Sequence, residues 1–388
     1  MERFVAPLVQ AQTSFAFAFL KEVTNGGPNA VCCSPFSVSV CLAMLYAGAK
    51  GETRREIEKL IAGDNRVREA DIHLYFCALL DQILKREPND ASRDYMFVLE
   101  TANKLFVREG LTLKESYEKI IGGEYAGMME QVDFVDSERV CNKINAWVTK
   151  STHGMIKEIM KVDEFKPEIA MVILNAVYFN SKWEHEFSKK ATKEGDFRVN
   201  SKRTKKVEFL NMKAKFRYDE DESVQVVRLP YKSERIANYV FLPKEVQEIG
   251  SLFDGFDSQM IGDLMQKVRD QRERLNVTLK LPKFEVETLI DLNEVLKKLG
   301  MTRSFGKRAD FSGITDDEAL RIGQAVQKTV IKVNEKGTEA ASVTRFGPMT
   351  GSTCHSRPRS VEFIADHPFL YFIVDERSRC VLFAGSFT

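Results

Sequence analysis

The pattern of apolar residues changes near residue 170, and this change is the sequence feature that most constrains the fold. Before it the segments have helical character: the segment 35–47 begins with Pro35 and is followed by Gly48, and apolar residues recur at helical spacing over 71–86. After it comes the apolar, β-branched run MVILNAVYFN (171–180), which is typical of a strand buried on both faces. Helical segments followed by strands, without βαβ alternation, predict an α+β fold with large, mainly antiparallel sheets.

Several later segments alternate apolar and polar residues with the period of a strand. These segments are 224–231, 235–243, 275–287 and 325–337, and the segment 369–387 has the pattern of a closing hairpin. No internal repeat and no linker rich in proline, glycine or serine divides the chain. We therefore predict one domain over residues 1–388.

Composition excludes several classes of function. Lys and Arg number 57 and Asp and Glu number 56, and the resulting net charge of +1 argues against nucleic acid as the main partner. No apolar run reaches the roughly 18 residues that a membrane-spanning helix needs. The N-terminus lacks the pattern of a signal peptide, so we expect a protein that is cytoplasmic, or secreted without a recognisable signal peptide.

The residue types that carry chemistry form no pattern of an enzyme or a metal site. The seven cysteines include no CxxC pair and the five histidines have no ligand spacing, so we expect mostly buried, free thiols and no metal. The sequence contains no GxSxG, HExxH, GxGxxG or Walker motif. We therefore predict a monomeric protein that is not an enzyme and needs no cofactor.

The segment 334–367 combines the properties of a loop and of a strand. Small residues follow Gly337, and a long polar stretch without apolar periodicity comes after them. Loops of this length inside compact domains are uncommon and usually functional. With the strand period of two, one face carries only small side chains and the other carries the charged ones. The small face holds Thr338, Ala340, Ser342 and Thr344, and the other face holds Glu339, Ala341, Val343 and Arg345.

Five short motifs in this chain are similar to motifs of one family. They are Ser34-Pro35-Phe36-Ser37, then Asn175-Ala176-Val177-Tyr178-Phe179 with Trp183, then Asp310-Phe311-Ser312-Gly313-Ile314, then the hinge Glu335-Lys336-Gly337-Thr338-Glu339-Ala340-Ala341, and the ending from Asp366 to Gly385. In this order they resemble a serpin (a serine protease inhibitor) over essentially the whole chain. The N-terminus without a leader and the end at Thr388 resemble the ovalbumin-like intracellular serpins.

The resemblance implies a fold and a set of site residues. The fold would have three mainly antiparallel β-sheets, about eight to nine helices and an exposed reactive-centre loop at about 337–361. The hinge would comprise Glu335, Gly337, Thr338, Glu339, Ala340, Ala341 and Ser342. The shutter and breach, where the central sheet opens, would comprise Ser34, Pro35, Ser37, Asn175, Trp183 and Gln327. Gln327 stands where many serpins carry a histidine; because glutamine donates and accepts hydrogen bonds, we expect an altered latch rather than a lost one.

The resemblance also implies a mechanism, that of a suicide substrate. A serine protease attacks the loop and forms an acyl-enzyme, and the freed hinge then inserts into the central sheet and carries the protease with it. A non-inhibitory serpin that acts as a binding, storage or chaperone protein is the alternative. Such members tend to carry bulky or charged residues at the inward hinge positions, whereas the residues here are small.

The position of the scissile bond follows from counting along the loop. In the family, the residue before the scissile bond lies fourteen positions after the hinge glycine. Counting from Gly337, this residue is Gly351, and Ser352 is on the leaving side. Cleavage there or nearby suits an elastase-like or chymotrypsin-like protease. A trypsin-like protease is the second choice. It would cleave after Arg357 or Arg359 of the loop, and these lie six and eight residues beyond Gly351, which lengthens the chain that joins the protease to the sheet by roughly 20–26 Å. The alternative sites are Met349 and Thr350 on one side, and Arg357 and Arg359-Ser360 on the other.

Overall fold

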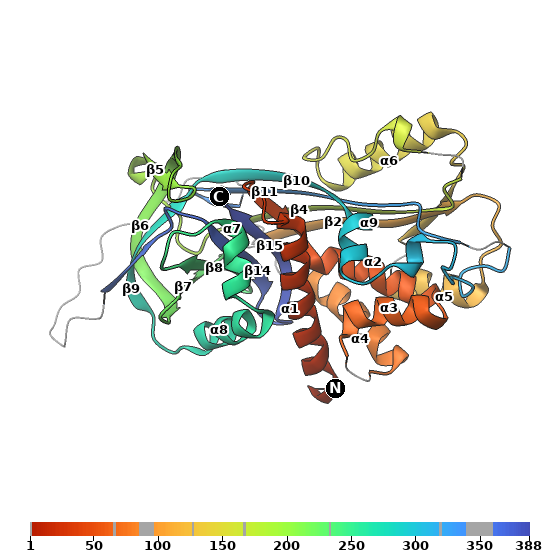
Figure 1. The fold of residues 1–388 in the computed structure, drawn as a ribbon, viewed down its shortest axis with the longest axis horizontal. Coiled ribbons are helices and arrows are strands. Elements are labelled where there is room, and N and C mark those ends of the chain that lie inside the picture. The colour runs from red at the N-terminus through yellow and green to blue at the C-terminus, as the bar shows by residue number, and fades with distance from the viewer. Residues whose placement is uncertain are drawn as a thin grey trace, which may run out of the picture.

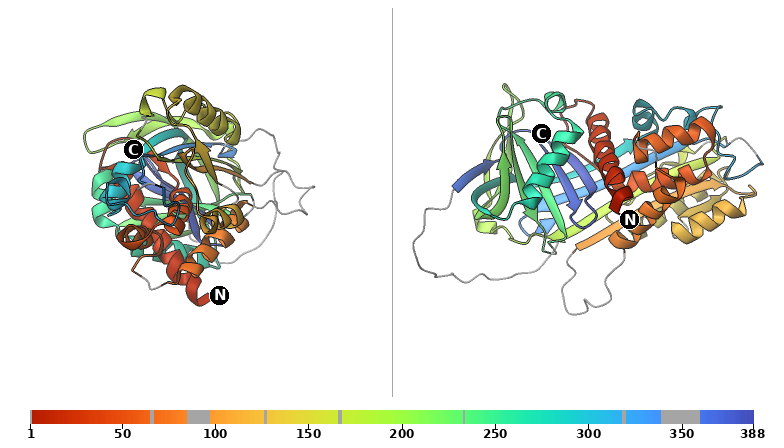
Figure 2. Two further views of the ribbon diagram at one scale, coloured as in Figure 1. Left: turned by 90° about the vertical axis from the view of Figure 1, so that its right-hand side faces the viewer. Right: turned by 90° about the horizontal axis from the view of Figure 1, so that it is seen from below.

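The computed structural model describes residues 2–64, 67–84, 97–125, 128–165, 168–232, 234–317, 320–338 and 360–388. The strands of its central sheet run along the longest axis of the molecule, and most helices gather on one side of that sheet (Figure 1, Figure 2). The single helix α6 (Ser137–Ser151) lies on the opposite side, across the central sheet. The chain therefore has the α+β architecture that the sequence predicts.

The central sheet has six strands in the order β10-β11-β12-β4-β2-β3. Two neighbouring pairs are parallel, namely β11 with β4 and β2 with β3, and the remaining pairs are antiparallel. The bounds are β2 (Phe97–Arg108), β3 (Met129–Val132), β4 (Met171–Lys182), β10 (Phe284–Asp291), β11 (Gln324–Asn334) and β12 (Gly337–Thr338).

The remaining strands form one connected set of nine, in the order β1-β15-β14-β8-β7-β6-β9-β13 with β5 on β6. The seventeen-residue strand β6 belongs to two sheets, because one end pairs with β7 and the other with β9 and β5. With the central sheet this makes three mainly antiparallel sheets, as predicted. The bounds are β1 (Val31–Cys33), β5 (Lys193–Arg198), β6 (Thr204–Glu220), β7 (Val224–Pro230), β8 (Ile236–Pro243), β9 (Leu275–Pro282), β13 (Ser360–Ile364), β14 (Phe369–Asp375) and β15 (Cys380–Phe387).

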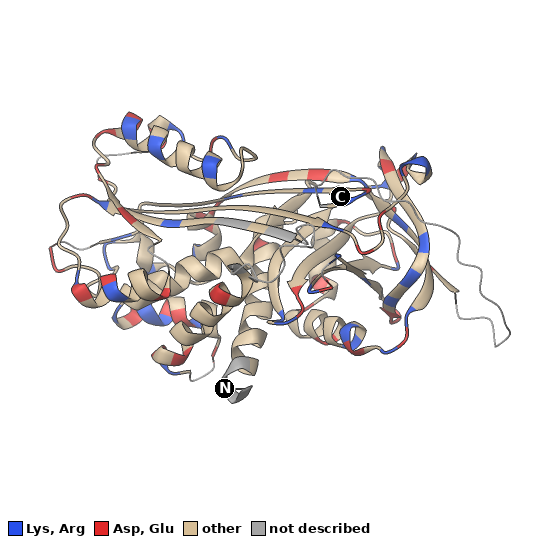
Figure 3. Cartoon of the chain, turned by 180° about the vertical axis from the view of Figure 1, so that it is seen from behind, with Lys and Arg blue, Asp and Glu red and all other residues tan. Residues whose placement is uncertain are grey.

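Nine α-helices occur within the described residues, in agreement with the prediction of eight to nine. Besides α6 they are α1 (Glu2–Thr24), α2 (Pro35–Gly48), α3 (Gly51–Ala62), α4 (Glu69–Leu84), α5 (Glu115–Glu124), α7 (Ile249–Gly255), α8 (Ser258–Asp270) and α9 (Leu292–Lys298). Three short 3-10 turns cover Val162–Glu164, Lys189–Ala191 and Arg303–Phe305. Acidic and basic residues are interspersed over the helices, which fits the near-zero net charge (Figure 3).

Helix α2 is completely buried and lies beneath the central sheet. All fourteen of its residues are buried, and the Ser34 hydroxyl accepts a hydrogen bond from the Ser37 backbone N–H at 3.4 Å as the N-cap. Pro35 occupies the first helical position, where the missing N–H has no cost. Strand β4 is also buried over nearly its whole length, because α2 lies on one side of it and α6 on the other.

Candidate functional site

Strands β11 and β4 form a pair that the short strand β12 divides at one end. They pair directly and in parallel from Gln324 with Val172 to Val330 with Tyr178. Beyond that point β12 lies between them, with Thr338 opposite both Val333 and Ser181. β12 runs antiparallel to both neighbours. The first two residues of an additional strand are therefore already in place at the top of the sheet.

Glycine is required at position 337, where the chain turns into the sheet. Gly337 has a φ of +150°, which side-chain-bearing residues rarely adopt. A Cβ atom at this position would come within 2.1 Å of the carbonyl oxygen of Ser181 and 2.6 Å of the Cα of Lys182. Because these contacts are with backbone, no side-chain rearrangement would relieve them.

Trp183 connects β4 to the start of the hinge. Its indole Nε1 donates to the carbonyl oxygen of Asn334 at 3.0 Å, and its backbone N–H donates to the carbonyl oxygen of Lys336 at 2.9 Å. The ring is 2% exposed and stacks on Tyr231, with 4.4 Å between the ring centroids and 10° between the planes. The tryptophan therefore fixes the turn between β11 and β12 to the end of β4.

Glu335 holds the same turn from the other side. Its carboxylate accepts hydrogen bonds from Thr192 Oγ1 at 3.0 Å and Lys283 Nζ at 3.3 Å, and its carbonyl oxygen accepts from the Phe187 N–H at 2.7 Å. Burial acts to raise the pKa of Glu335, but hydrogen bonds from its own backbone N–H, Thr192 and Lys283 outweigh burial and leave the pKa below the ordinary value. The charged form of this side chain is therefore the one that the site binds.

A buried hydrogen-bond network crosses the closed part of the β11–β4 pair. Gln327 is fully buried; its Oε1 accepts from the Ser34 N–H at 2.9 Å, and its Nε2 donates to the Ser34 carbonyl at 3.0 Å and to Asn175 Oδ1 at 2.5 Å. Asn175 Nδ2 donates to Ser37 Oγ at 2.7 Å and to Asn103 Oδ1 at 2.8 Å. Ser37 Oγ also donates to Asn103 Oδ1 at 2.5 Å. The network thus joins β11, β4 and β2 to the start of α2.

Five of the six predicted shutter and breach residues lie close together, and the structure adds partners to them. Ser34, Pro35, Ser37, Asn175 and Gln327 meet at the start of α2, whereas Trp183 lies at the end of β4 beside the hinge. Sequence reasoning missed Asn103, Thr192 and Lys283. No strand was predicted over 97–108, so the sequence offered no signal for Asn103.

Two buried side chains of the central sheet, one on β2 and one on β11, contain polar atoms that lack a partner in the described chain. Asn103 Nδ2 and Thr329 Oγ1 are buried and have no hydrogen bond within the part of the chain that the structure describes. Thr329 lies two residues after Gln327 in β11, so the two side chains lie on the same face of the sheet, the one toward α2. Buried polar groups are nearly always hydrogen-bonded, so these two exceptions require an explanation.

Most predicted reactive-centre residues lie outside the described residues. Ser360 is described: it is exposed and begins β13, opposite Asn276 of β9. The residues outside are Glu339, Ala340, Ala341, Ser342, Met349, Thr350, Gly351, Ser352, Arg357 and Arg359. Within the described ranges, no group of His, Cys, Asp and Glu side chains could hold a metal ion. No helix there is long and apolar enough to cross a membrane.

Comparison with known proteins identifies the family. The family described as "Serpin (serine protease inhibitor)" matches residues 10–388, so the chain belongs to the serpin family. Related proteins include human plasminogen activator inhibitor 2, which is 31% identical over 98% of this chain and 99% of its own length. Leukocyte elastase inhibitor of Bos taurus is 32% identical over 97% of this chain and 98% of its own length.

Solved serpin structures share the fold. Uncleaved ovalbumin is 26% identical with a TM-score of 0.83 and covers 98% of each chain. Maspin is 26% identical with a TM-score of 0.86 and covers 100% of this chain and 99% of its own. Serpin48 of Tenebrio molitor, titled a highly specific serpin, is 28% identical with a TM-score of 0.80 over 98% of this chain and 97% of its own. The fold and family predicted from the sequence are thus confirmed.

Proposed function

We propose that this serpin inhibits serine proteases as a suicide substrate, by inserting the residues after Thr338 between β11 and β4. The observation that carries the proposal is the pairing of β12 with both strands, at the end where β11 and β4 no longer pair with each other. Below it β11 and β4 are direct neighbours and pair with each other. Extending β12 would replace one parallel ladder by two antiparallel ladders, which are slightly more stable for each residue.

The register of β12 assigns a place to each residue that would follow. Continuing from Thr338 opposite Ser181, Ser342 falls opposite Val177 and Thr329, and Thr344 falls opposite Asn175 and Gln327. Directly opposite residues share a face of the sheet, so the small residues enter the side that faces α2. The Ser342 hydroxyl then meets the unpaired Thr329 hydroxyl and supplies the partner that this group lacks.

The other face of the inserted strand meets different surroundings at its two ends. Glu339 falls opposite Asn180 and Lys332, which are half-buried, so its carboxylate can reach solvent and the lysine. Arg345 falls opposite Leu174 and Val326, which are buried in the core beneath α6. A guanidinium there would need α6 to shift or its own side chain to extend to solvent. Insertion past Thr344 is therefore the difficult part of the process.

Insertion requires the hydrogen bonds that join β11 to β4 through Gln327 and Asn175 to break. Neighbouring strands lie about 4.8 Å apart, so an additional strand would move β11 to about 9.6 Å from β4. The hydrogen bond of 2.5 Å between Gln327 and Asn175 cannot span that separation. The Gln327 side chain therefore acts as the latch, and Thr344 would replace it as the partner of Asn175.

Inhibition follows from the covalent chemistry at the scissile bond. The protease serine attacks the carbonyl of Gly351, the bond to the nitrogen of Ser352 breaks, and an ester joins the inhibitor to the protease. The amine leaves with the proton that the protease histidine has taken from the serine. Insertion then carries the esterified protease along the sheet by about 3.3 Å per residue before water completes the hydrolysis.

Covalent complex formation on a denaturing gel tests the proposal. The purified protein is mixed with an elastase-like, a chymotrypsin-like and a trypsin-like protease, each with its active serine blocked in a parallel sample. We expect a band that survives detergent and boiling with the elastase-like or chymotrypsin-like enzyme and not with the blocked enzymes. Cleavage without such a band for all three would contradict inhibition and favour a binding, storage or chaperone serpin.

A further inference from the structure

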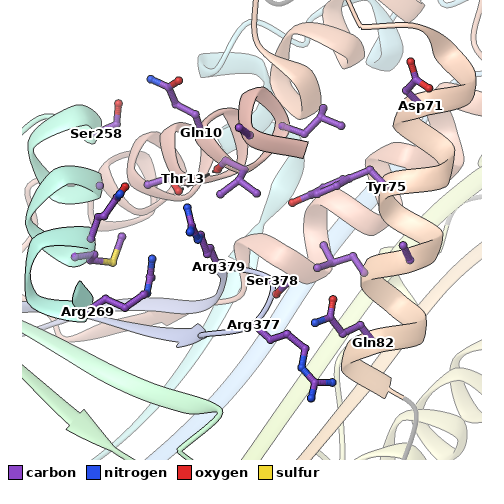
Figure 4. A pocket seen from close by; sticks show the side chains of 18 of the residues that line it. Gln10, Thr13, Asp71, Tyr75, Gln82, Ser258, Arg269, Arg377, Ser378 and Arg379 are labelled. Carbon is purple, nitrogen blue, oxygen red and sulfur yellow. Dashed lines mark hydrogen bonds between the residues drawn. The ribbon is translucent and has the colours of Figure 1, made fainter. Parts of the chain in front are cut away.

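Helix α1 has different surroundings at its two ends. Near its start, Gln10 and Thr13 line a cavity between α1, α4 and α8 (Figure 4). At its other end the helix stops at Thr24, and the exposed pair Asn25-Gly26 begins the connection to β1. This pair is the single Asn-Gly sequence among the 388 residues of the chain. The end of α1 is therefore the one place where an asparagine is followed by a residue without a side chain.

Asn25 ends the helix in the left-handed backbone conformation. Its φ is +45°, and its backbone N–H donates to the Lys21 carbonyl at 3.1 Å, which is the bond that closes a left-handed C-cap. Asparagine tolerates this conformation better than most residues that carry a side chain. Gly26 also has a positive φ, of +63°. The helix end thus places both residues in a turn at the surface, where water reaches them.

The backbone nitrogen of Gly26 is available for a reaction. The N–H groups on either side of it are bonded, that of Asn25 to Lys21 and that of Gly27 to the Thr24 carbonyl at 2.8 Å. The Gly26 N–H has no hydrogen bond within the part of the chain that the structure describes. Because glycine has no side chain, nothing on Gly26 itself blocks the approach of this nitrogen to the side chain of Asn25.

A lysine at the end of α9 contacts the Asn25 amide. Lys298 Nζ donates to Asn25 Oδ1 at 3.4 Å and lies 3.9 Å from a carboxylate oxygen of Glu22. When a nucleophile attacks Cγ of Asn25, negative charge develops on Oδ1, and the ammonium group beside it stabilises that charge. The amide nitrogen Nδ2 makes no hydrogen bond to the described residues, so no contact there opposes its departure.

We propose that Asn25 is a site of spontaneous deamidation, at which the folded chain converts its own asparagine into aspartate and isoaspartate. The Gly26 nitrogen attacks Cγ of Asn25 and loses its proton, the bond from Cγ to Nδ2 breaks, and the amide nitrogen leaves with that proton as ammonia. A cyclic imide remains, and water opens it at one of its two carbonyl carbons. Opening at Cγ gives aspartate, whereas opening at the main-chain carbonyl gives isoaspartate. Water is the only co-reactant.

Formation of isoaspartate changes the contacts of this turn. Gly26 lies against Gly250 of α7, because a Cβ atom added to Gly250 would be 3.5 Å from the Cα of Gly26. Slightly further along, the Pro28 carbonyl accepts from Thr388 Oγ1 at 2.5 Å. Isoaspartate adds a methylene group to the main chain between α1 and these two contacts, so it should displace the turn and lower the melting temperature. Aspartate keeps the main-chain length and places a carboxylate beside Lys298.

Mass spectrometry of the aged protein tests the proposal on the full chain. The folded protein and a synthetic peptide of residues 22–30 are kept in the same mildly alkaline buffer, and tryptic peptides are sequenced at intervals. We expect Asn25 in the folded protein to gain the mass of an amide-to-acid exchange at least as fast as in the peptide. Asn200 precedes Ser201 and should stay intact, because its Oδ1 accepts from the N–H groups of Lys202 and Arg203. If the peptide reacts while the folded protein keeps Asn25, the proposal is overturned.

Two variants and one control assign the reaction to this turn. Asn25→Gly removes the amide and keeps a residue that tolerates a positive φ, so labelling by protein isoaspartyl methyltransferase should disappear. Lys298→Met should slow deamidation several-fold, whereas Lys297→Met, which removes the same charge from the neighbouring position of α9, should not. Equal labelling of Asn25→Gly and wild type would overturn the assignment, and equal rates for Lys298→Met and wild type would overturn the role of Lys298. None of these residues belongs to the hinge or the shutter, so the result does not depend on inhibition.

Discussion

Replacing Gln327 by leucine tests whether the buried network holds the central sheet closed. The Ser34 N–H and Asn175 Oδ1 would lose the single partner that each has within the described chain, whereas the Ser34 carbonyl would still accept from the Val38 N–H at 3.3 Å. Each buried polar group left unpaired costs about 1–3 kcal/mol, so the native form should lose about 3 kcal/mol. For 388 residues, an unfolding entropy of about 2 cal/mol/K per residue converts this loss into a melting temperature about 4 °C lower.

Differential scanning calorimetry of the uncleaved protein measures this change, and Gln324→Leu is the matched control. Gln324 lies on the same strand but is half-buried, and its side chain has no hydrogen bond with the described residues. A weaker latch should also hasten the spontaneous loss of inhibitory activity on warming. If the melting temperature of Gln327→Leu equals that of the wild type, or if the melting temperature of Gln324→Leu falls by the same amount as that of Gln327→Leu, the latch assignment is refuted.

Three further predictions concern the hinge and the loop. Thr338→Arg should convert the inhibitor into a substrate, because an unpaired guanidinium on the inward face slows insertion and lets deacylation win; undiminished covalent complex on a gel would refute the register. Glu335→Gln should lower the melting temperature at neutral pH. The pKa of Glu335 in the folded protein is depressed, so its contribution to stability is complete above the ordinary value of 4.5 and is lost as the pH falls below that value. The melting temperatures of the variant and the wild type should therefore converge at low pH. A difference in melting temperature that stays constant with pH would argue against a role for the carboxylate. The double variant Arg357→Ala with Arg359→Ala should keep inhibition of an elastase-like or chymotrypsin-like enzyme, and loss of all inhibition would move the scissile bond toward Arg359.

The sequence predicted the types of most elements but not how distant segments meet. Burial on all sides gives α2 and β4 nearly uninterrupted apolar sequences, so Pro35 and Gly48 at the ends predicted α2 and the β-branched residues predicted β4. Periodicity was insufficient at 275–287, where the alternation continues through Pro282 although β9 and β10 belong to different sheets. Strand β2, which lies before residue 170 where only helices were predicted, was also missed.

The site shows the same division. The resemblance to serpins named Gln327, Asn175 and Trp183, because each lies within or near a short motif or at a comparable place in a strand. Local patterns contain no information about Asn103, which lies 72 residues from its partner Asn175, or about Thr192, which lies 143 residues from its partner Glu335. These contacts depend on strand register, and only the folded chain fixes it.

The distance between the two edges of the central sheet tests the insertion mechanism most directly. Strands β10 and β3 are the outermost strands, and Leu289 and Gln131 are exposed positions on them where cysteines can carry spin labels. Cys77, which is half-buried, and Cys354, which lies outside the described residues, would be replaced by serine beforehand, because the remaining five cysteines are buried. Pulsed electron resonance would compare the intact protein with its covalent complex with the protease. We predict that the distance increases by about 5 Å, the spacing of one additional strand. An unchanged distance in the complex would contradict insertion between β11 and β4.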